Sequence, residues 1–334
     1  MNVNKFEHTH SAHCESGVIS SMLRHYGLNL SEPMVFGLSN ALTFAYLPFV
    51  KIGGMPLVAY RSLPKSIIKN IQKNLKVKMK LETFSSKQKG QERLDQLLDE
   101  GKIVGAQSSV YWLPYFPEEM RFHFNAHNLV VFAKEGDEYL ISDPVFEHTV
   151  RCEKSALSKA RFTKGIMAPK GLLYYPTDVP KDVDLKPIIA KNIKKTAKSM
   201  LNTPVPISGL KGIKSLAKAI LKLQAKDKRY AKLYLGHIVR MQEEIGTGGA
   251  GFRYIYASFL QESSVLFGDD SVLLESSKMM LGVGDQWREF ALMIAKSLKS
   301  KNGIDFKAIS DKLLEISQEE AKVYKKMLEF KSNS

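Results

Sequence analysis

Cys14 is the residue in this sequence best suited to nucleophilic chemistry. It is one of two cysteines and comes just before an apolar-periodic run, Val18 to Tyr26, that predicts a helix ended by Gly27. The first turn of a helix offers unpaired N–H groups and the positive end of the macrodipole, and both favour a thiolate over a thiol. The pattern therefore predicts a reactive sulfur, against the simpler interpretation of a small buried residue.

A nucleophilic cysteine needs a base within hydrogen-bonding reach and a group that orients the base. His127 opens a predicted strand at 126–133, and Asp143 follows the predicted partner strand at 138–142. Antiparallel pairing would bring these two residues to the same end of the hairpin. We therefore predict Cys14 as nucleophile, His127 as general base and Asp143 as its orienting group, although each residue taken singly is more often structural.

An acyl-transfer site also needs donors for the oxyanion. Backbone N–H groups at the start of the Cys14 helix would supply some of them. The side-chain candidates for oxyanion stabilisation or for lining the pocket are His13, Glu15, Gln107 and Asn40. Spacing along the chain does not choose among them.

Two other kinds of site are weaker alternatives. His8, His10, His13 and Cys14 lie within seven residues, and zinc accepts such ligands, but no Cys-x-x-Cys or HExxH motif accompanies them. We predict no metal site. The glycine-rich segment 246–251 follows a predicted helix and lacks the Lys-Ser/Thr of a phosphate-binding loop, so it is interpreted as a helix connection.

The pattern of predicted helices and strands around these residues indicates two domains. Residues 1–176 alternate between short helices and strands, which indicates an α+β domain with an N-terminal helix and a mostly antiparallel sheet. Residues 36–46 are expected to form a short helix or loop against the first helix. Residues 177–187 form a polar, proline-bearing linker, and residues 188–334 have the periodicity of an all-α domain.

Chain length and composition indicate the class of protein and its cellular compartment. The chain of 334 residues is long enough for two cores. Its first residues lack the apolar core of a signal peptide, and no run approaches the ~18 apolar residues of a membrane span. With two cysteines a disulfide scaffold is not expected, so we predict a reducing, cytoplasmic location.

The formal net charge of +15 is concentrated in one stretch. Residues 181–240 hold fifteen Lys or Arg and three Asp or Glu. Such a surface attracts acidic proteins, anionic membranes or nucleic acid, while a solvated lysine-rich face is the simplest alternative. Interleaved aromatic residues and a recognisable motif are lacking, so nucleic-acid binding is not expected.

Several segments of the sequence resemble a known family of proteins. The segment HSAHCESGVISSMLRHYGLNLSEPMVFGLSNALTFAY resembles the N-terminal domain of the butirosin biosynthesis protein H (BtrH) family, as do YWLPYFP, FNAHNLVVFAKEGDEYLISDP and SALSKAR. EEIGTGGAGFRYIYASFLQES resembles the helical domain of unknown function that often follows it. One departure from the family pattern is Ser39-Asn40, which leaves the pocket chemistry at that position open.

The resemblance implies a papain-like fold and an acyltransferase activity. It implies that Cys14 takes an acyl or aminoacyl group from an acyl carrier protein thioester and that His127, oriented by Asp143, activates an amine or hydroxyl acceptor in specialised metabolism. It implies no bound cofactor, since the substrate arrives on the phosphopantetheine of the carrier. The lysine-rich surface would meet the acidic carrier.

Two other functions stay open from the sequence. A cysteine peptidase or amidase of the same fold would use water as acceptor. A non-enzymatic binding protein would use the basic helical domain, and peripheral membrane contact is a further option for that surface. The sequence identifies neither the acyl group nor the small-molecule or lipid acceptor, nor the oligomeric state.

Overall fold

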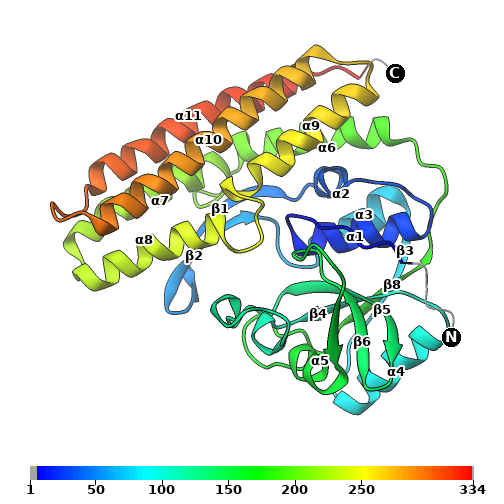
Figure 1. The fold of residues 1–334 in the computed structure, drawn as a ribbon. Helices are drawn as coiled ribbons and strands as arrows, with labels where there is room; N and C mark the ends of the chain where they lie inside the picture. The colour runs from blue at the N-terminus through cyan, green and yellow to red at the C-terminus, as the bar shows by residue number, and fades with distance from the viewer. Residues whose placement is uncertain (1–5, 333–334) are drawn as a thin grey trace. The chain divides into compact units, whose positions relative to one another are not determined.

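In this computed structural model, which describes residues 6–332, a six-stranded antiparallel sheet carries His127 on one strand, and Asp143 directly follows another (Figure 1). The chain divides into two units, of which the first comprises residues up to Val35 and Ile67–Val183. The helices of this unit are α1 (Cys14–His25), α3 (Ser66–Leu75), α4 (Lys87–Asp99) and α5 (Lys154–Arg161). Its strands, in sheet order, are β3 (Lys78–Glu82), β8 (Leu173–Asp178), β4 (Val104–Ser108), β5 (His127–Glu135), β6 (Glu138–Ser142) and β7 (Val150–Glu153).

Helix α1 packs against β5 and is buried from Cys14 to Leu23. Burial of ten consecutive residues explains why small side chains, including three serines and Gly17, alternate with large apolar ones in this helix. The helix ends near Gly27, whose φ of +93° suits glycine, as the sequence predicts. The nucleophile candidate is thus fixed on a rigid element that faces the sheet.

The β5–β6 hairpin forms as predicted, because its alternating apolar residues flank a Gly-containing turn. Val130 pairs with Ser142, and the register shifts between Val131 and Ala133. This pairing places the start of β5 and the end of β6 at the same end of the sheet. The two elements can therefore present His127 and Asp143 to each other.

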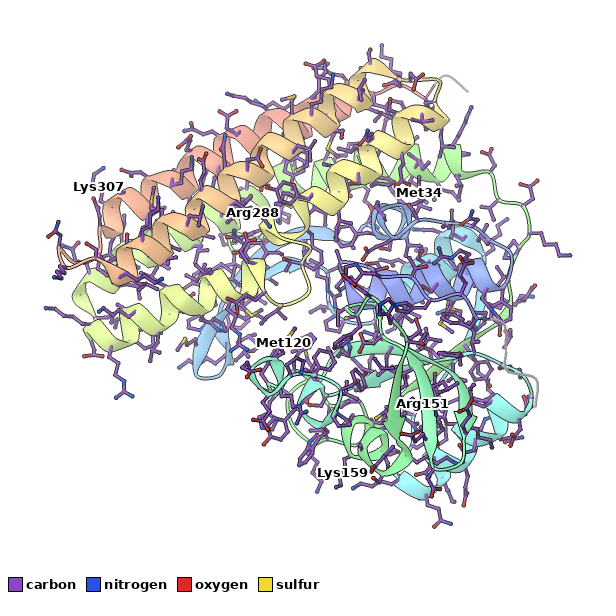
Figure 2. All side chains as sticks on the ribbon, in the orientation of Figure 1. Met34, Met120, Arg151, Lys159, Arg288 and Lys307 are labelled. Carbon is purple, nitrogen blue, oxygen red and sulfur yellow. The ribbon has the colours of Figure 1, made fainter. Side chains whose placement is uncertain are left out.

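The outer strand β7 carries charge at the exposed edge of the sheet. Arg151, labelled in Figure 2, donates to Glu135 at 2.6 Å and to Glu138 at 3.2 Å. The side chains of these ion pairs are between 40% and 54% exposed, so the pairs contribute little to stability. The charged side chains disfavour pairing of this edge strand with a strand of another molecule.

The second unit comprises Phe36–Ser66 and the residues from Asp184 onward. Helix α2 (Glu32–Leu38) runs into it from the first unit. The second unit contains a two-stranded hairpin of β1 (Leu42–Ile52) and β2 (Met55–Arg61), which are joined at Gly53-Gly54. Its long helices are α6 (Leu185–Asn202), α7 (Gly209–Lys222), α8 (Lys228–Glu243), α9 (Arg253–Leu266), α10 (Ser271–Lys299) and α11 (Phe306–Glu329).

A buried ion pair lies at the centre of this helical core. The Arg253 guanidinium donates to Glu320 at 2.9 Å, and both side chains are fully buried. Trp287 Nε1 and the Tyr324 hydroxyl also donate to the Glu320 carboxylate, at 2.6 and 2.9 Å. With four donated hydrogen bonds in total, the carboxylate is satisfied, which is the condition under which a buried charge is tolerated.

The glycine-rich segment 246–251 connects α8 to α9, as predicted from its lack of a phosphate-binding motif. Gly251 has a φ of +56°, and a Cβ there would lie 2.3 Å from the Tyr60 ring. The glycine therefore allows the close approach of this connection to β2. Its role in the structure is packing.

The two compact units divide the chain differently from the predicted domains, which were 1–176 and 188–334. Residues 36–66 belong to the helical unit and not to the 1–176 domain, and part of the segment expected as a helix or loop, 36–46, is strand β1. The physical reason is long-range pairing: Tyr46 N donates to Ile207 O, and β1 packs on α7. The transition at 183–184 lies inside the predicted linker, 177–187.

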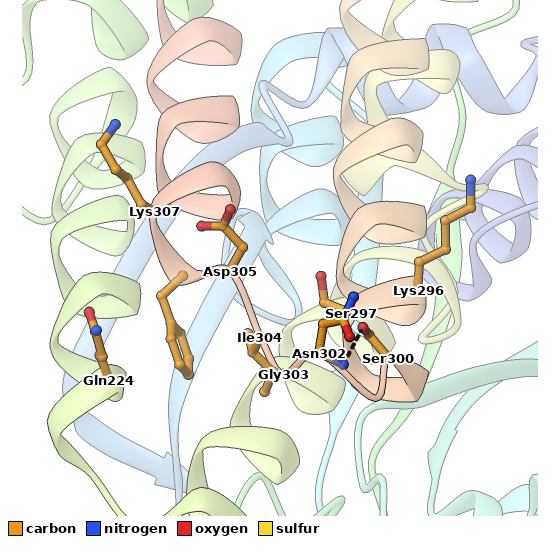
Figure 3. A pocket seen from close by; sticks show the side chains of 10 residues that line it. Gln224, Lys296, Ser297, Ser300, Asn302, Gly303, Ile304, Asp305 and Lys307 are labelled. Atoms are coloured by element: carbon orange, nitrogen blue, oxygen red, sulfur yellow. Dashed lines mark hydrogen bonds between the residues drawn. The ribbon is translucent and has the colours of Figure 1, made fainter.

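The predicted fold class is confirmed. The first unit is an N-terminal helix with an antiparallel sheet, and the C-terminal region from Leu185 is helical through the described residues. No described helix is long and apolar enough to cross a membrane. A hollow of about 650 Å³ lies at the α10–α11 turn, between residues such as Lys296, Asn302 and Asp305 (Figure 3). None of the predicted catalytic residues lines it.

Candidate active site

The thiol of Cys14 lies at the first residue of α1. The helix is capped by His13, whose Nδ1 accepts the backbone N–H of Ser16 at 3.3 Å. Cys14 itself is 5% exposed. Its backbone N–H has no hydrogen-bond partner among residues 6–332, so it is available to a substrate oxyanion.

His127 and Asp143 form a buried pair next to this sulfur. His127 Nε2 lies 2.7 Å from Asp143 Oδ2, and the two side chains are 5% and 0% exposed. Cys14 lies close enough to His127 that its charge and a hydrogen bond raise the pKa of the imidazole. Because Nε2 is engaged by the carboxylate, Nδ1 is the ring nitrogen that remains for the sulfur.

The charge state of the pair follows from its surroundings. Burial alone lowers the pKa of His127, but the charge and hydrogen bond of Asp143, together with Cys14, raise it to about 10. The imidazole is therefore protonated at neutral pH when its partner is a thiolate. A thiolate–imidazolium pair is the reactive form of a thiol nucleophile.

Asp143 is held in place by two further donors. The Tyr115 hydroxyl donates to Oδ2 at 2.9 Å, and the backbone N–H of Val145 donates to Oδ1 at 3.3 Å. Burial, and then the Asp143 charge, raises the pKa of Tyr115 well above its usual value, so its hydroxyl remains a donor. The Phe116 ring meets the His127 ring edge-on at 5.5 Å. The 115–116 pair thus restrains both the orienting carboxylate and the base.

A carboxylate anchors the loop before the nucleophile. Glu32 accepts the backbone N–H groups of Ala12 and His13, both at 2.8 Å, and the Ser16 hydroxyl at 3.0 Å. Burial raises the pKa of Glu32, while these hydrogen bonds act in the opposite direction. The contacts fix the chain that leads into Cys14.

An amide from the sheet also reaches the sulfur. Asn128 Nδ2 lies 3.9 Å from Cys14 Sγ and donates to Ala126 O at 3.0 Å. Its Oδ1 accepts the Tyr174 hydroxyl at 3.0 Å. Asn128 follows the base directly in the sequence, but no pattern indicated that its side chain would contact the cysteine.

The structure brings the three predicted catalytic residues together, and two of the other candidates make structural contacts beside the nucleophile. His13 is the N-cap of α1, and Glu15 Oε1 accepts N–H groups at the start of α3, from Ile67 at 3.1 Å and Ile68 at 3.4 Å. Glu15 therefore joins two helices of the first unit. These contacts give both residues structural roles next to the nucleophile.

The two amide candidates differ in position. Gln107 lies on β4 opposite Asn128, buried, with its Oε1 lacking a partner among the described residues. Asn40 belongs to the second unit, where its Nδ2 donates to Asn192 Oδ1 at 2.6 Å and its Oδ1 accepts the Thr196 hydroxyl. The amide that contacts Cys14 is Asn128, which the sequence did not single out.

Sequence reasoning also missed Glu32 and Tyr115. The segment Ser31-Glu32-Pro33 has only the sequence pattern of a helix start, and the Ser31 hydroxyl accepts the Met34 N–H. Tyr115 lies in the aromatic loop YWLPYFP, where nothing marked one tyrosine above another. Over the residues that the structure describes, no group of three or more His, Cys, Asp or Glu side chains is arranged to hold a metal ion.

Comparison with known proteins adds the family. Residues 155–327 match the model of a domain of unknown function, DUF4872. The chain belongs to the DUF4872 family. Residues 13–144, which include Cys14, His127 and Asp143, match the model described as butirosin biosynthesis protein H, N-terminal. The resemblance seen in the sequence is therefore confirmed, with a BtrH N-terminal domain followed by the DUF4872 domain.

The DUF4872 match begins within α5, which belongs to the first unit, and continues through the part of the second unit that begins at Asp184. One solved structure that resembles the chain is described as a C39-like peptidase from Bacillus anthracis. It shares 14% identity with a TM-score of 0.37, and the match covers 53% of this chain and 98% of that one. No curated protein matches the chain.

Proposed function

We propose that this protein is a papain-like thiol acyltransferase of specialised metabolism that works through an acyl-enzyme on Cys14. The observation that carries the proposal is the convergence of Cys14, His127 and Asp143 at the start of α1. The match to the BtrH N-terminal model supports a thiol enzyme. A nucleophile, a base within reach and a restrained orienting carboxylate are the parts that covalent acyl transfer requires.

The first step is attack of the Cys14 thiolate on the carbonyl carbon of an acyl thioester. The tetrahedral oxyanion would accept the free N–H of Cys14. When the thioester bond breaks, the His127 imidazolium gives its proton to the departing thiolate, which leaves as a thiol. The products of this step are the Cys14 acyl-enzyme and neutral His127.

In the second step, an amine or hydroxyl acceptor attacks the acyl-enzyme while His127 takes its proton. The Cys14 thiolate then leaves, which restores the thiolate–imidazolium pair. Transfer competes with hydrolysis, because water is the most abundant nucleophile. The burial of Cys14 and His127 in the first unit supports transfer, since it limits the water that reaches the acyl group.

The test is incubation with an acyl-loaded carrier protein, followed by intact-mass analysis of both proteins. We expect an adduct on this protein that an added amine discharges faster than water does, with the acyl group found on the amine. A simple acyl thioester of cysteamine is the matched substrate without a carrier. Discharge by water alone, or turnover of peptides in the absence of any thioester, would instead identify a peptidase or amidase.

The partner in this proposal is an acyl carrier protein that docks on the lysine-rich helices. Between Leu185 and Ala225 the chain has nine lysines and no Asp or Glu. Lys211, Lys214 and Lys218 lie exposed on α7 and form no ion pair within the described part of the chain. Carrier proteins are acidic, and opposite charges accelerate association at low salt.

Charge reversal tests this docking surface. Substitution of Lys211, Lys214 and Lys218 by glutamate is expected to weaken carrier binding at low salt by about tenfold or more, with a smaller difference at high salt. The control is the same substitution at Lys278, Lys299 and Lys301, which are also exposed in the second unit. Equal carrier affinity for the two triple variants would exclude the α7 surface as the docking site.

A further inference from the structure

We propose that Asn128 is a further catalytic residue, whose amide N–H₂ stabilises the Cys14 thiolate and is aimed at it by Tyr174. The proposal rests on the proposed function, because it assigns a role toward the same sulfur. It starts from the 3.9 Å contact between Asn128 Nδ2 and Cys14 Sγ. The amide is 2% exposed, so water does not replace it as a donor.

The orientation of the amide is fixed by its other contacts. The group that faces the Ala126 carbonyl oxygen at 3.0 Å must be the N–H₂, because two oxygens would repel each other. The opposite end accepts the Tyr174 hydroxyl and must therefore be Oδ1. An N–H₂ group has two protons: one is used by Ala126, and the other is left for the sulfur.

Tyr174 reaches this position because of a glycine on the neighbouring strand. Gly105 pairs with Tyr174 across β4 and β8, and a Cβ at Gly105 would lie 2.2 Å from the Tyr174 ring. The ring therefore lies over the glycine, with its hydroxyl at Asn128. Burial, followed by the charges of Glu15 and Cys14, raises the pKa of Tyr174 well above its usual value, so the hydroxyl remains a donor.

The charged groups around the sulfur explain why a neutral donor is useful. His127 on β5 favours the thiolate, whereas Glu15 on α1 acts together with the sulfur to raise the pKa of Tyr174. The Asn128 amide stabilises the anion without carrying a proton that titrates, so it does not compete with His127 in acid–base steps. A hydrogen bond to a charged group in a buried site is stronger than one between neutral groups.

The test measures the rate of Cys14 alkylation by iodoacetamide as a function of pH in the full-length protein. Asn128→Ala is expected to move the acidic limb of this profile to higher pH, with about tenfold slower alkylation at a given pH on that limb. Asn128→Asp is expected to slow it further, because the carboxylate repels the thiolate. Cys152 does not interfere, since burial raises its pKa to about 12.

Tyr174→Phe separates orientation from folding. This substitution keeps the Asn128 side chain but removes the hydroxyl that donates to its Oδ1. We expect the acidic limb of the alkylation profile to move to higher pH, by less than in Asn128→Ala. The matched control is Tyr139→Phe, which removes another buried hydroxyl of the same sheet, donated to Asp95 at 2.7 Å. The control is expected to leave the alkylation profile of the wild type unchanged.

The outcomes distinguish this inference from the proposed function. An unchanged profile in folded Asn128→Ala overturns the role of Asn128, and if that variant does not fold, an unchanged profile in Tyr174→Phe does so. Equal shifts in the Tyr174 and Tyr139 variants also overturn it, because the effect would then be general loosening of the sheet. A wild-type profile without a reactive thiolate at neutral pH would overturn the proposed function itself.

Discussion

Replacement of Cys14 by serine is expected to reduce acyl-thioester cleavage by at least about 10⁴-fold and to abolish the covalent adduct. A serine hydroxyl at this site is a much weaker nucleophile, because it is not ionised by a neighbouring imidazole as a thiol is. In a serine protease with a Ser-His-Asp triad, loss of the nucleophile costs on the order of 10⁶ in rate. The measurement is release of free thiol from an acyl thioester, together with intact mass.

The matched control for this substitution is Cys152→Ser. Cys152 is buried on β7 and its thiol is held protonated, with its pKa raised to about 12 by burial. We expect its replacement to leave thioester cleavage within a few-fold of the wild type. Equal loss of activity in the two variants, or full activity in Cys14→Ser, would contradict the assignment of the nucleophile.

Replacement of Asp143 by asparagine is expected to lower the rate by about 10³- to 10⁴-fold and to change its pH dependence. Burial lowers the pKa of His127, and the charge and hydrogen bond of Asp143 are the main interactions that raise it. Without the carboxylate, the pKa of His127 falls toward or below its usual value of 6.5. The imidazolium needed to protonate the leaving thiol is then scarce at neutral pH.

The sign of the pH effect follows from the raised pKa. In the wild type, the proton of His127 is lost only as pH rises through about 10, so the basic limb of the rate profile lies there. The stability that this proton contributes is complete below the unfolded value of about 6.5 and is lost over the same rise. In Asp143→Asn both effects move to lower pH.

The control for the Asp143 substitution is Asp95→Asn. Asp95 also accepts a buried tyrosine hydroxyl in the first unit, from Tyr139 at 2.7 Å, but it does not contact His127. Its replacement is expected to leave the basic limb of the profile where it is in the wild type. A basic limb that stays near pH 10 in Asp143→Asn would show that this carboxylate does not set the charge of the base.

The parts of the site that the sequence predicted are those set by local pattern. The β5–β6 hairpin follows from alternation around a Gly-containing turn, and it places Asp143 where its Oδ2 lies 2.7 Å from His127 Nε2. The start of α1 at Cys14 follows from the apolar period of the residues after it. Each of these features depends on neighbours a few residues away along the chain.

The parts that the sequence did not predict depend on distant contacts. Residues 36–66 join the helical unit because β1 meets the 207–208 segment, more than 150 residues later, which no local pattern shows. Asn128 contacts the sulfur because Tyr174 and Gly105, on two other strands, fix its amide. Glu32 anchors the loop before Cys14 across about twenty residues, although its position looked like an ordinary helix start.

The most direct test of the central claim is to locate the acyl group after the protein has reacted with an acyl thioester. The protein is quenched in acid during turnover, digested, and its peptides are sequenced by mass spectrometry. We expect the acyl group on Cys14, and we expect an added amine to remove it. An acyl group on Cys152 or on lysines alone, or turnover without acylation of Cys14, would contradict it.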